Sequence, residues 1–178
     1  MSKSIVHYTT YLSETLAVLV DPGLLLVSQG EDGVPNAMTI GWGTVGVIWG
    51  KQVFTVLVRP SRYTFSRLEE SDSFTVNVPP PGLHDAVTFC GTRSGRDYDK
   101  FTECEMTVEP SQAVSAPGIA ECPVVYECQI VHRTDVVNAT LDSDILTTFY
   151  SSGDLHRIYH GEILAVRAAE GVREALGL

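Results

Sequence analysis

Short apolar runs separated by turn residues dominate the chain from residue 16 to residue 58. The runs are rich in leucine, β-branched or aromatic residues and predict strands: LAVLV (16–20), LLLVSQ (24–29), VPNAMTIGW (34–42), TVGVIW (44–49) and QVFTVLV (52–58). The residues between them favour tight turns, at Asp21-Pro22-Gly23, Gly30-Glu31-Asp32-Gly33 and Gly50-Lys51. Short strands joined by tight turns predict a meander that closes into a barrel or packs as a sandwich.

Two stretches further along have apolar residues at helical spacing. RYTFSRLEES (62–71) places Phe65 and Leu68 toward the core. GLHDAVTFCG (82–91) has apolar residues at i, i+3, i+4 and i+7. The run FTVNVP (74–79) lies between them and is stopped by Pro79, Pro80 and Pro81. The pattern predicts a short helix, a strand and a second short helix.

The later part of the chain returns to strand patterns after an irregular stretch. Residues 91–120 are rich in Gly, Pro, Ser and Thr and predict loops. Two strand regions and a short helix follow, in CPVVYECQIVHRTDVV (122–137), HGEILAVRA (160–168) and EGVREALGL (170–178). Residues 1–15 show little periodicity and predict an arm or a first turn that leads into the core. Because no repeat or long linker occurs, we expect one domain over residues 1–178, mainly β with flanking helices.

The chain is acidic, with 22 acidic and 12 basic residues and a formal net charge of −10 at pH 7. Nucleic-acid binding depends on neutralising phosphates with basic side chains, so we expect no nucleic-acid partner. The first sixteen residues contain no uninterrupted apolar stretch, and no run approaches the ~20 apolar residues that span a bilayer. We therefore expect a cytoplasmic protein without a membrane partner.

Four cysteines, at positions 90, 104, 122 and 128, form no C-x-x-C pair. Free thiols are the expectation for such a chain. The five histidines stand at no spacing typical of zinc ligands, so we predict no metal site.

The run VRPSRYTF (58–65) concentrates phosphate-binding chemistry where a strand gives way to a helix. Arg59 and Arg62 carry planar guanidinium groups that match phosphate oxygens two at a time. Ser61 and Thr64 can add hydroxyl donors, and a helix starting near Ser61 would add backbone N–H groups. The run predicts a phosphate cradle. A Ser N-cap on a surface helix, with the arginines in solvent, is the alternative.

The glycine run from Gly41 to Gly46 matches G-x-G-x-x-G but continues into the strand-like VIWGKQVFTV. A dinucleotide fingerprint needs a helix at that point, so we reject this interpretation. Dense glycines in a strand indicate a bulge or close backbone approach to a flat ligand. No G-x-S-x-G motif occurs and paired carboxylates cannot be assigned from spacing, so no catalytic residue is predicted.

Two aromatic positions leave alternatives open. Trp42 and Trp49 flank the glycine run, and packing in the core or at its rim explains both. Trp42 could also line an aromatic ligand. His160, just before Gly161, is either a hydrogen-bonded structural histidine or a cofactor contact.

Four motifs together resemble the flavin reductase-like family of FMN-binding split barrels, which includes the flavoredoxins. They are NAMTIGWGTVG (36–46), VRPSRYTF (58–65), FTVNVP (74–79) and CGTRSGRDYDKF (90–101), in an order that spans about residues 15–168. The resemblance implies an antiparallel split β-barrel of six or so strands with flanking helices. It also implies a homodimer with FMN near the subunit interface.

Carried over by position, the resemblance implies a set of cofactor-binding residues. The phosphate would lie at Arg59, Ser61, Arg62 and Thr64. The flavin ring would lie along Asn36, Met38, Thr39, Ile40, Gly41 and Trp42. The ribityl-phosphate side would be closed by Cys90, Gly91, Ser94 and Lys100, and His160 would face the flavin.

The resemblance implies redox chemistry, for which three interpretations stay open. The first is an NAD(P)H:flavin oxidoreductase that passes hydride from NADH or NADPH to flavin N5. The second is a flavoredoxin-like electron carrier reduced by a protein donor. The third is a flavin-holding module without catalysis. Pyridoxamine-phosphate oxidases share the split barrel, but their arginine and lysine pattern is not found.

Overall fold

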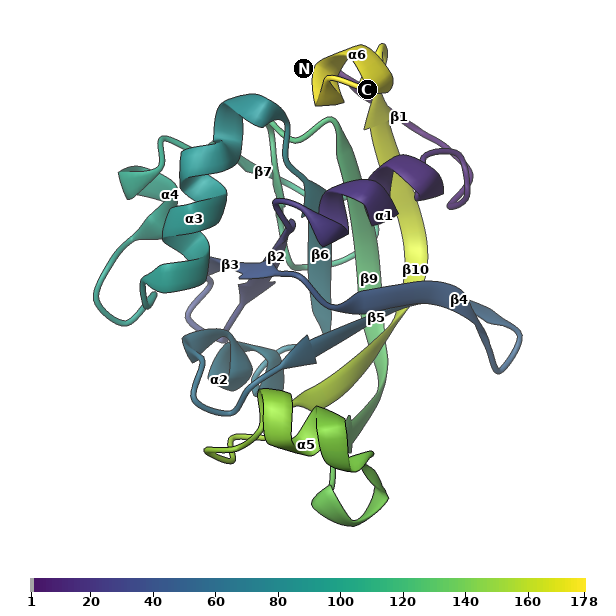
Figure 1. Cartoon of the computed structure of the whole chain (residues 1–178). Helices are drawn as coiled ribbons and strands as arrows, with labels where there is room; N and C mark the ends of the chain where they lie inside the picture. Colours follow the sequence, from purple (N-terminus) through teal and green to yellow (C-terminus); the bar gives the residue numbers. More distant parts are fainter. Residues whose placement is uncertain (1) are drawn as a thin grey trace.

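An antiparallel sheet of eight strands organises the computed structural model, which describes residues 2–178 (Figure 1). The strands follow the order β3-β2-β6-β9-β10-β5-β4, with β1 added alongside β10. Their bounds are β1 (Lys3–Ile5), β2 (Leu24–Gln29), β3 (Pro35–Ile40), β4 (Gly43–Ile48), β5 (Lys51–Val58), β6 (Ser73–Val78), β9 (Val124–Asp135) and β10 (Arg157–Ala169). The predicted strands from residue 24 onward are thereby confirmed.

A very short connection joins the two edges of this sheet. β3 ends at Ile40 and β4 begins at Gly43, so only two residues separate strands at opposite ends of the order. The sheet must therefore curl until its edges approach each other, as in a barrel. Because β3 and β4 are not paired neighbours in that order, the barrel stays split, which confirms the predicted fold class.

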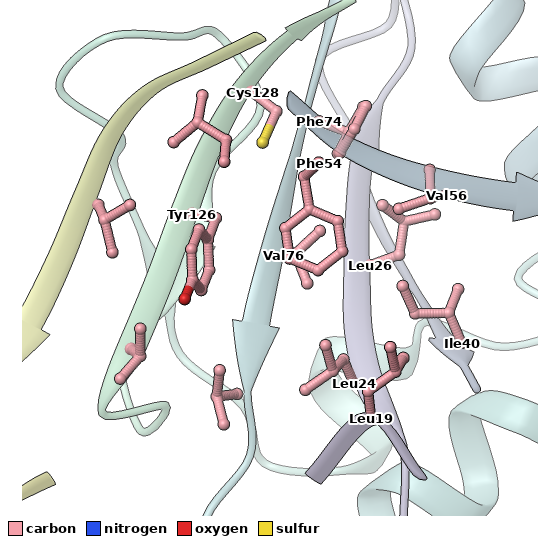
Figure 2. Close-up of a cluster of buried hydrophobic side chains, with 14 of the residues drawn as sticks. Leu19, Leu24, Leu26, Ile40, Phe54, Val56, Phe74, Val76, Tyr126 and Cys128 are labelled. Carbon is pink, nitrogen blue, oxygen red and sulfur yellow. The ribbon is translucent and has the colours of Figure 1, made fainter. Parts of the chain in front are cut away.

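The inside of the curled sheet holds the larger apolar core (Figure 2). Phe54 packs edge to face against Tyr126, with ring centroids 5.3 Å apart. Phe74 joins them, and all three are fully buried. Full burial of such side chains contributes roughly 1.5–3 kcal/mol each, so this core supplies much of the driving force for closing the sheet.

Helices cover a second, smaller apolar cluster on the outer face of β2 and β3. Leu24 and Leu26 belong to the inner core, whereas Leu25 and Val27 belong to this outer cluster, as alternation along a strand requires. Two helices, α3 (His84–Thr92) and α4 (Lys100–Glu103), contribute residues to this outer cluster. The helices α1 (Leu12–Val20), α2 (Tyr63–Glu69) and α6 (Val172–Leu176) contribute to the inner core, and α5 (Ser143–Phe149) has no buried residue. The small elements that complete the fold are η1 (Pro81–Leu83), β7 (Val108–Glu109), β8 (Gly118–Ile119) and η2 (Asn138–Thr140).

The strand predicted over residues 16–20 is wrong, because these residues form the second half of α1. Thr15, Val18 and Leu19 are buried at i, i+3 and i+4, which is helical spacing. Leu16 and Val20 are apolar but exposed, so the run looked continuously hydrophobic. Residues 1–15 also hold more structure than the predicted arm or first turn, since β1 pairs with β10 and α1 starts within them.

Other differences concern segments with weak patterns. The stretch 91–120 contains α4 and the β7–β8 pair, and α5 lies where no element was predicted. All four cysteines are free thiols, as predicted. Among residues 2–178, no helix is long and apolar enough to cross a membrane.

Candidate functional site

Three adjoining pockets form one groove along the edge strand β3. The first has a volume of about 210 Å³ and includes Met38, Trp42 and Arg62 in its wall. The second, of about 170 Å³, shares Met38 and Arg62 with the first. The third, of about 280 Å³, shares Gly95 and Lys100 with the second. β3, α2 and α3 lie on the same side of the molecule and build this groove (Figure 1).

The groove brings together every predicted site residue except His160. The first pocket is lined by Met38, Thr39, Ile40, Gly41, Trp42 and Arg59. The second is lined by Ser61, Arg62, Thr64, Cys90, Gly91, Ser94 and Lys100, and Asn36 lines the third. His160 lies elsewhere, on β10, where its ring stacks on His132 with centroids 5.4 Å apart. The structure therefore does not place His160 with the other candidates.

Lys100 is a buried cation beneath the second pocket. The residue is 5% exposed, and its Nζ donates to the carbonyl oxygens of Ala37 (2.9 Å) and Cys90 (3.0 Å). No carboxylate of the described chain forms an ion pair with it. Burial, the largest effect, lowers the pKa of Lys100, because it penalises the charged form. An ammonium buried without a counter-ion is what an anionic ligand would stabilise.

Arg59 and Ser61 already have partners in the segment that follows α5. The Arg59 guanidinium donates to the carbonyl oxygens of Phe149 (2.8 Å) and Asp154 (2.9 Å). The backbone N–H and the hydroxyl of Ser61 donate to the Asp154 carboxylate, at 3.1 and 2.6 Å. Arg59 and Ser61 therefore hold the segment after α5 in place. Of the two arginines of the predicted phosphate cradle, Arg62 is the one that lines both the first and the second pocket.

The helix after the cradle begins later than predicted. α2 starts at Tyr63, its N-cap residue is Arg62, and no side chain caps it, so the alternative of a Ser61 N-cap is wrong. Thr64 is buried, and its hydroxyl oxygen accepts from the Asn36 side-chain amide at 2.8 Å. This bond fixes α2 against β3 and orients the wall of the groove.

Gly95 permits the tight turn that closes the second pocket. A Cβ at this position would collide with the Asn36 carboxamide and would lie 2.7 Å from the Tyr63 ring. Only glycine lets the chain after α3 come this close to β3 and α2.

His156 is the main site residue that sequence reasoning missed. It lines the first pocket, is 9% exposed, and its ring lies 5.1 Å from that of Trp42. Its Nδ1 is hydrogen-bonded to the Tyr150 hydroxyl at 2.8 Å, and Phe149 packs edgewise on Trp42 at 5.0 Å. The sequence around residues 149–156 carries neither a motif nor periodicity, so no signal pointed to this wall.

His156 is expected to make the protein less stable as the pH falls from 6.5 toward 4. Burial, followed by the charge of Arg59, lowers the pKa of His156 from 6.5 to about 4. The unfolded chain therefore binds a proton in this window that the folded chain does not, so the free energy of unfolding falls, by at most about 3 kcal/mol. Urea unfolding at a series of pH values should show a steeper decline for the wild type than for His156→Gln. If the free energy of unfolding fell equally steeply with pH in both proteins, the lowered pKa of His156 would be contradicted.

Comparisons with known proteins agree with this architecture. A family model described as "Flavin reductase like domain" matches residues 20–178. An uncharacterized protein of Archaeoglobus fulgidus is 31% identical over 150 residues, covering 84% of this chain and 73% of that protein.

Solved structures with the same fold include the following two. Flavoredoxin of Desulfovibrio vulgaris (Miyazaki F) superposes with a TM-score of 0.67 at 24% identity, covering 96% of this chain and 78% of that one. The FMN-binding domain of a flavin reductases-like enzyme from Shewanella baltica superposes with a TM-score of 0.66 at 18% identity. The superposition covers 94% of this chain and 77% of that one.

Proposed function

This chain belongs to the flavin reductase-like domain family, and we propose that it binds FMN in the groove along β3 and transfers hydride from NADH or NADPH to it. The observation that carries the proposal is Lys100, a buried ammonium in the wall of the second pocket that has no carboxylate partner among residues 2–178. A phosphate monoester would supply the missing negative charge.

The two ends of the groove differ in chemistry in the way that FMN requires. Around the second pocket, Arg62, Lys100 and Ser94 offer cationic and hydroxyl donors for a phosphate. Around the first pocket, Met38, Trp42 and Leu57 offer apolar surface for a flat ring. The solved structure from Shewanella baltica is described as an FMN-binding domain, which supports the same ligand for this chain.

Bound FMN would supply the hydride-accepting chemistry, so the protein needs no general acid or base of its own. The chain's own residues would bind FMN and orient its ring. β3 is an edge strand, so backbone groups on its unpaired side can hydrogen-bond the polar edge of the ring. Trp42 and Leu57 would exclude water from the ring, and His156, whose pKa is lowered by burial, would be a neutral imidazole beside it at pH 7. The single domain over residues 1–178 and the homodimer stay predictions.

Anaerobic titration of the purified chain tests the proposal directly. FMN should bind saturably with a shift of its absorption band, and NADH or NADPH should then bleach that band. Bleaching only after a reduced redox protein is added would favour the electron-carrier alternative over the reductase. Absence of saturable FMN binding would contradict the site itself.

Arg62→Ala is expected to weaken FMN binding about 10- to 150-fold, because a hydrogen bond between charged groups contributes about 1.5–3 kcal/mol. Arg59→Ala is the matched control, since its guanidinium is held by the carbonyl oxygens of Phe149 and Asp154. We expect Arg59→Ala to lower the thermal unfolding temperature more than Arg62→Ala does, and to change FMN affinity less. Equal losses of affinity would contradict this division of roles.

A further inference from the structure

Two histidines face each other on the sheet, away from the groove. His132 on β9 and His160 on β10 are direct cross-strand partners, and their rings stack with an interplanar angle of 29° and centroids 5.4 Å apart. The β4–β5 turn beside them projects on the side of the molecule opposite to α3 and α4 (Figure 1). Neither ring contributes to the groove, and the proposed function uses neither.

Trp49 covers this pair from a backbone conformation that tryptophan rarely adopts. Trp49 and Gly50 form the turn between β4 and β5, with φ of 56° and 73°. Hairpin turns with two positive φ values favour Asn-Gly, and a bulky residue there is strained. Trp49 is 62% exposed, and its ring packs edgewise on His132 and His160 at 5.5 and 6.0 Å. Strain kept at an exposed position is a reason to look for a function.

His160 is oriented as metal-binding histidines are. Its Nδ1 is hydrogen-bonded to the Thr55 hydroxyl at 3.0 Å, which leaves Nε2 for another partner. Metal-binding histidines commonly use their second ring nitrogen in such a bond, which fixes the ring and its tautomer.

We propose that His132 and His160 bind a divalent transition-metal ion of the Ni²⁺ or Cu²⁺ type through one nitrogen each. Metal–imidazole bonds are about 2.0–2.1 Å long, so the two nitrogens must come within about 4.2 Å of each other. Ring centroids 5.4 Å apart permit this, because His132 is exposed and can turn. Imidazole suits these ions rather than Mg²⁺ or Ca²⁺, and affinity rises toward Cu²⁺.

Water completes the coordination sphere in this proposal. Residues 2–178 contain no group of three or more histidine, cysteine, aspartate or glutamate side chains placed to hold a metal ion. A site with two protein ligands binds more weakly than a closed structural zinc site, and exchange with solvent is expected. The site is independent of the flavin groove, so its failure would leave the proposed function untouched.

Calorimetric titration with Ni²⁺ tests the site on the full chain, purified without a polyhistidine tag. We expect one ion per chain, with quenching of Trp49 fluorescence. His132→Asn and His160→Asn should each weaken binding by about tenfold or more, since each removes a ligand. Thr55→Val should weaken it about tenfold while leaving both ligands in place.

His84→Asn is the matched control, because His84 is an exposed histidine at the start of α3. This variant should bind Ni²⁺ as the wild type does. Saturable binding that persists unchanged in the His132→Asn/His160→Asn double variant would overturn the proposal. So would wild-type protein that shows no saturable binding.

Discussion

Lys100→Met is expected to abolish most of the preference of this chain for FMN over riboflavin. The two ligands differ only in the phosphate, so the ratio of their affinities isolates what the protein gains from that group. If Lys100 supplies a charged hydrogen bond to the phosphate, the ratio should fall about 10- to 150-fold. Riboflavin should bind the variant and the wild type alike. Fluorescence titration with both flavins measures the four affinities.

The control for this experiment is Lys51→Met. Lys51 is an exposed lysine on β5 whose partner is Glu162 at 2.6 Å, so its removal changes the net charge equally without touching the groove. Its affinity ratio should match that of the wild type. An equal loss for FMN and riboflavin in Lys100→Met would instead mean that Lys100 only supports the fold through Ala37 and Cys90.

The sequence predicted the strands because each carries enough apolar residues to be recognised locally. β2 is the clearest case, since five of its six residues are buried. The prediction of a strand over residues 16–20 failed because of tertiary packing. Whether Leu16 and Val20 are buried depends on what packs over them, and both are exposed. Local composition cannot tell an apolar exposed face from a buried one.

The candidate site was predictable where its residues are close in sequence. The runs around Arg62 and Lys100 carry charge and hydroxyl chemistry in short spans, and the fold brings both to the second pocket. His160 stays a prediction, because it lies on β10 apart from the residues that line the groove. Tyr159, its neighbour, is fully buried against the core, so His160 must face the other way. The alternation of side chains along a strand does not by itself tell which alternate residues face the core.

His156 and Asp154 could not be predicted because their roles depend on distant contacts. Asp154 reaches Ser61, and the Tyr150 hydroxyl orients His156 beside Trp42. Each contact joins segments whose approach depends on how the whole sheet curls. A single sequence offers no local property from which that approach follows.

A buried ion pair lies beneath the β7–β8 strands. The Nε of Arg167 donates to Oε1 of Glu127 at 2.5 Å, and both side chains are almost completely buried. The second carboxylate oxygen of Glu127 accepts from the backbone N–H groups of Gln112 and Ala113, at 2.9 and 2.6 Å. Glu127 therefore holds the irregular chain before β8 onto β9.

Arg167→Met is expected to lower the free energy of unfolding by about 3–5 kcal/mol, because it leaves the Glu127 carboxylate buried without a positive partner. Adding Glu127→Gln should restore most of this loss, since a neutral amide oxygen can still accept from Gln112 and Ala113. Urea unfolding of the flavin-free wild type, both single variants and the double variant measures the coupling. Lys51→Met, which breaks an exposed pair, should cost less than about 1 kcal/mol. If Arg167→Met cost no more than Lys51→Met, the buried pair would not stabilise this part of the fold.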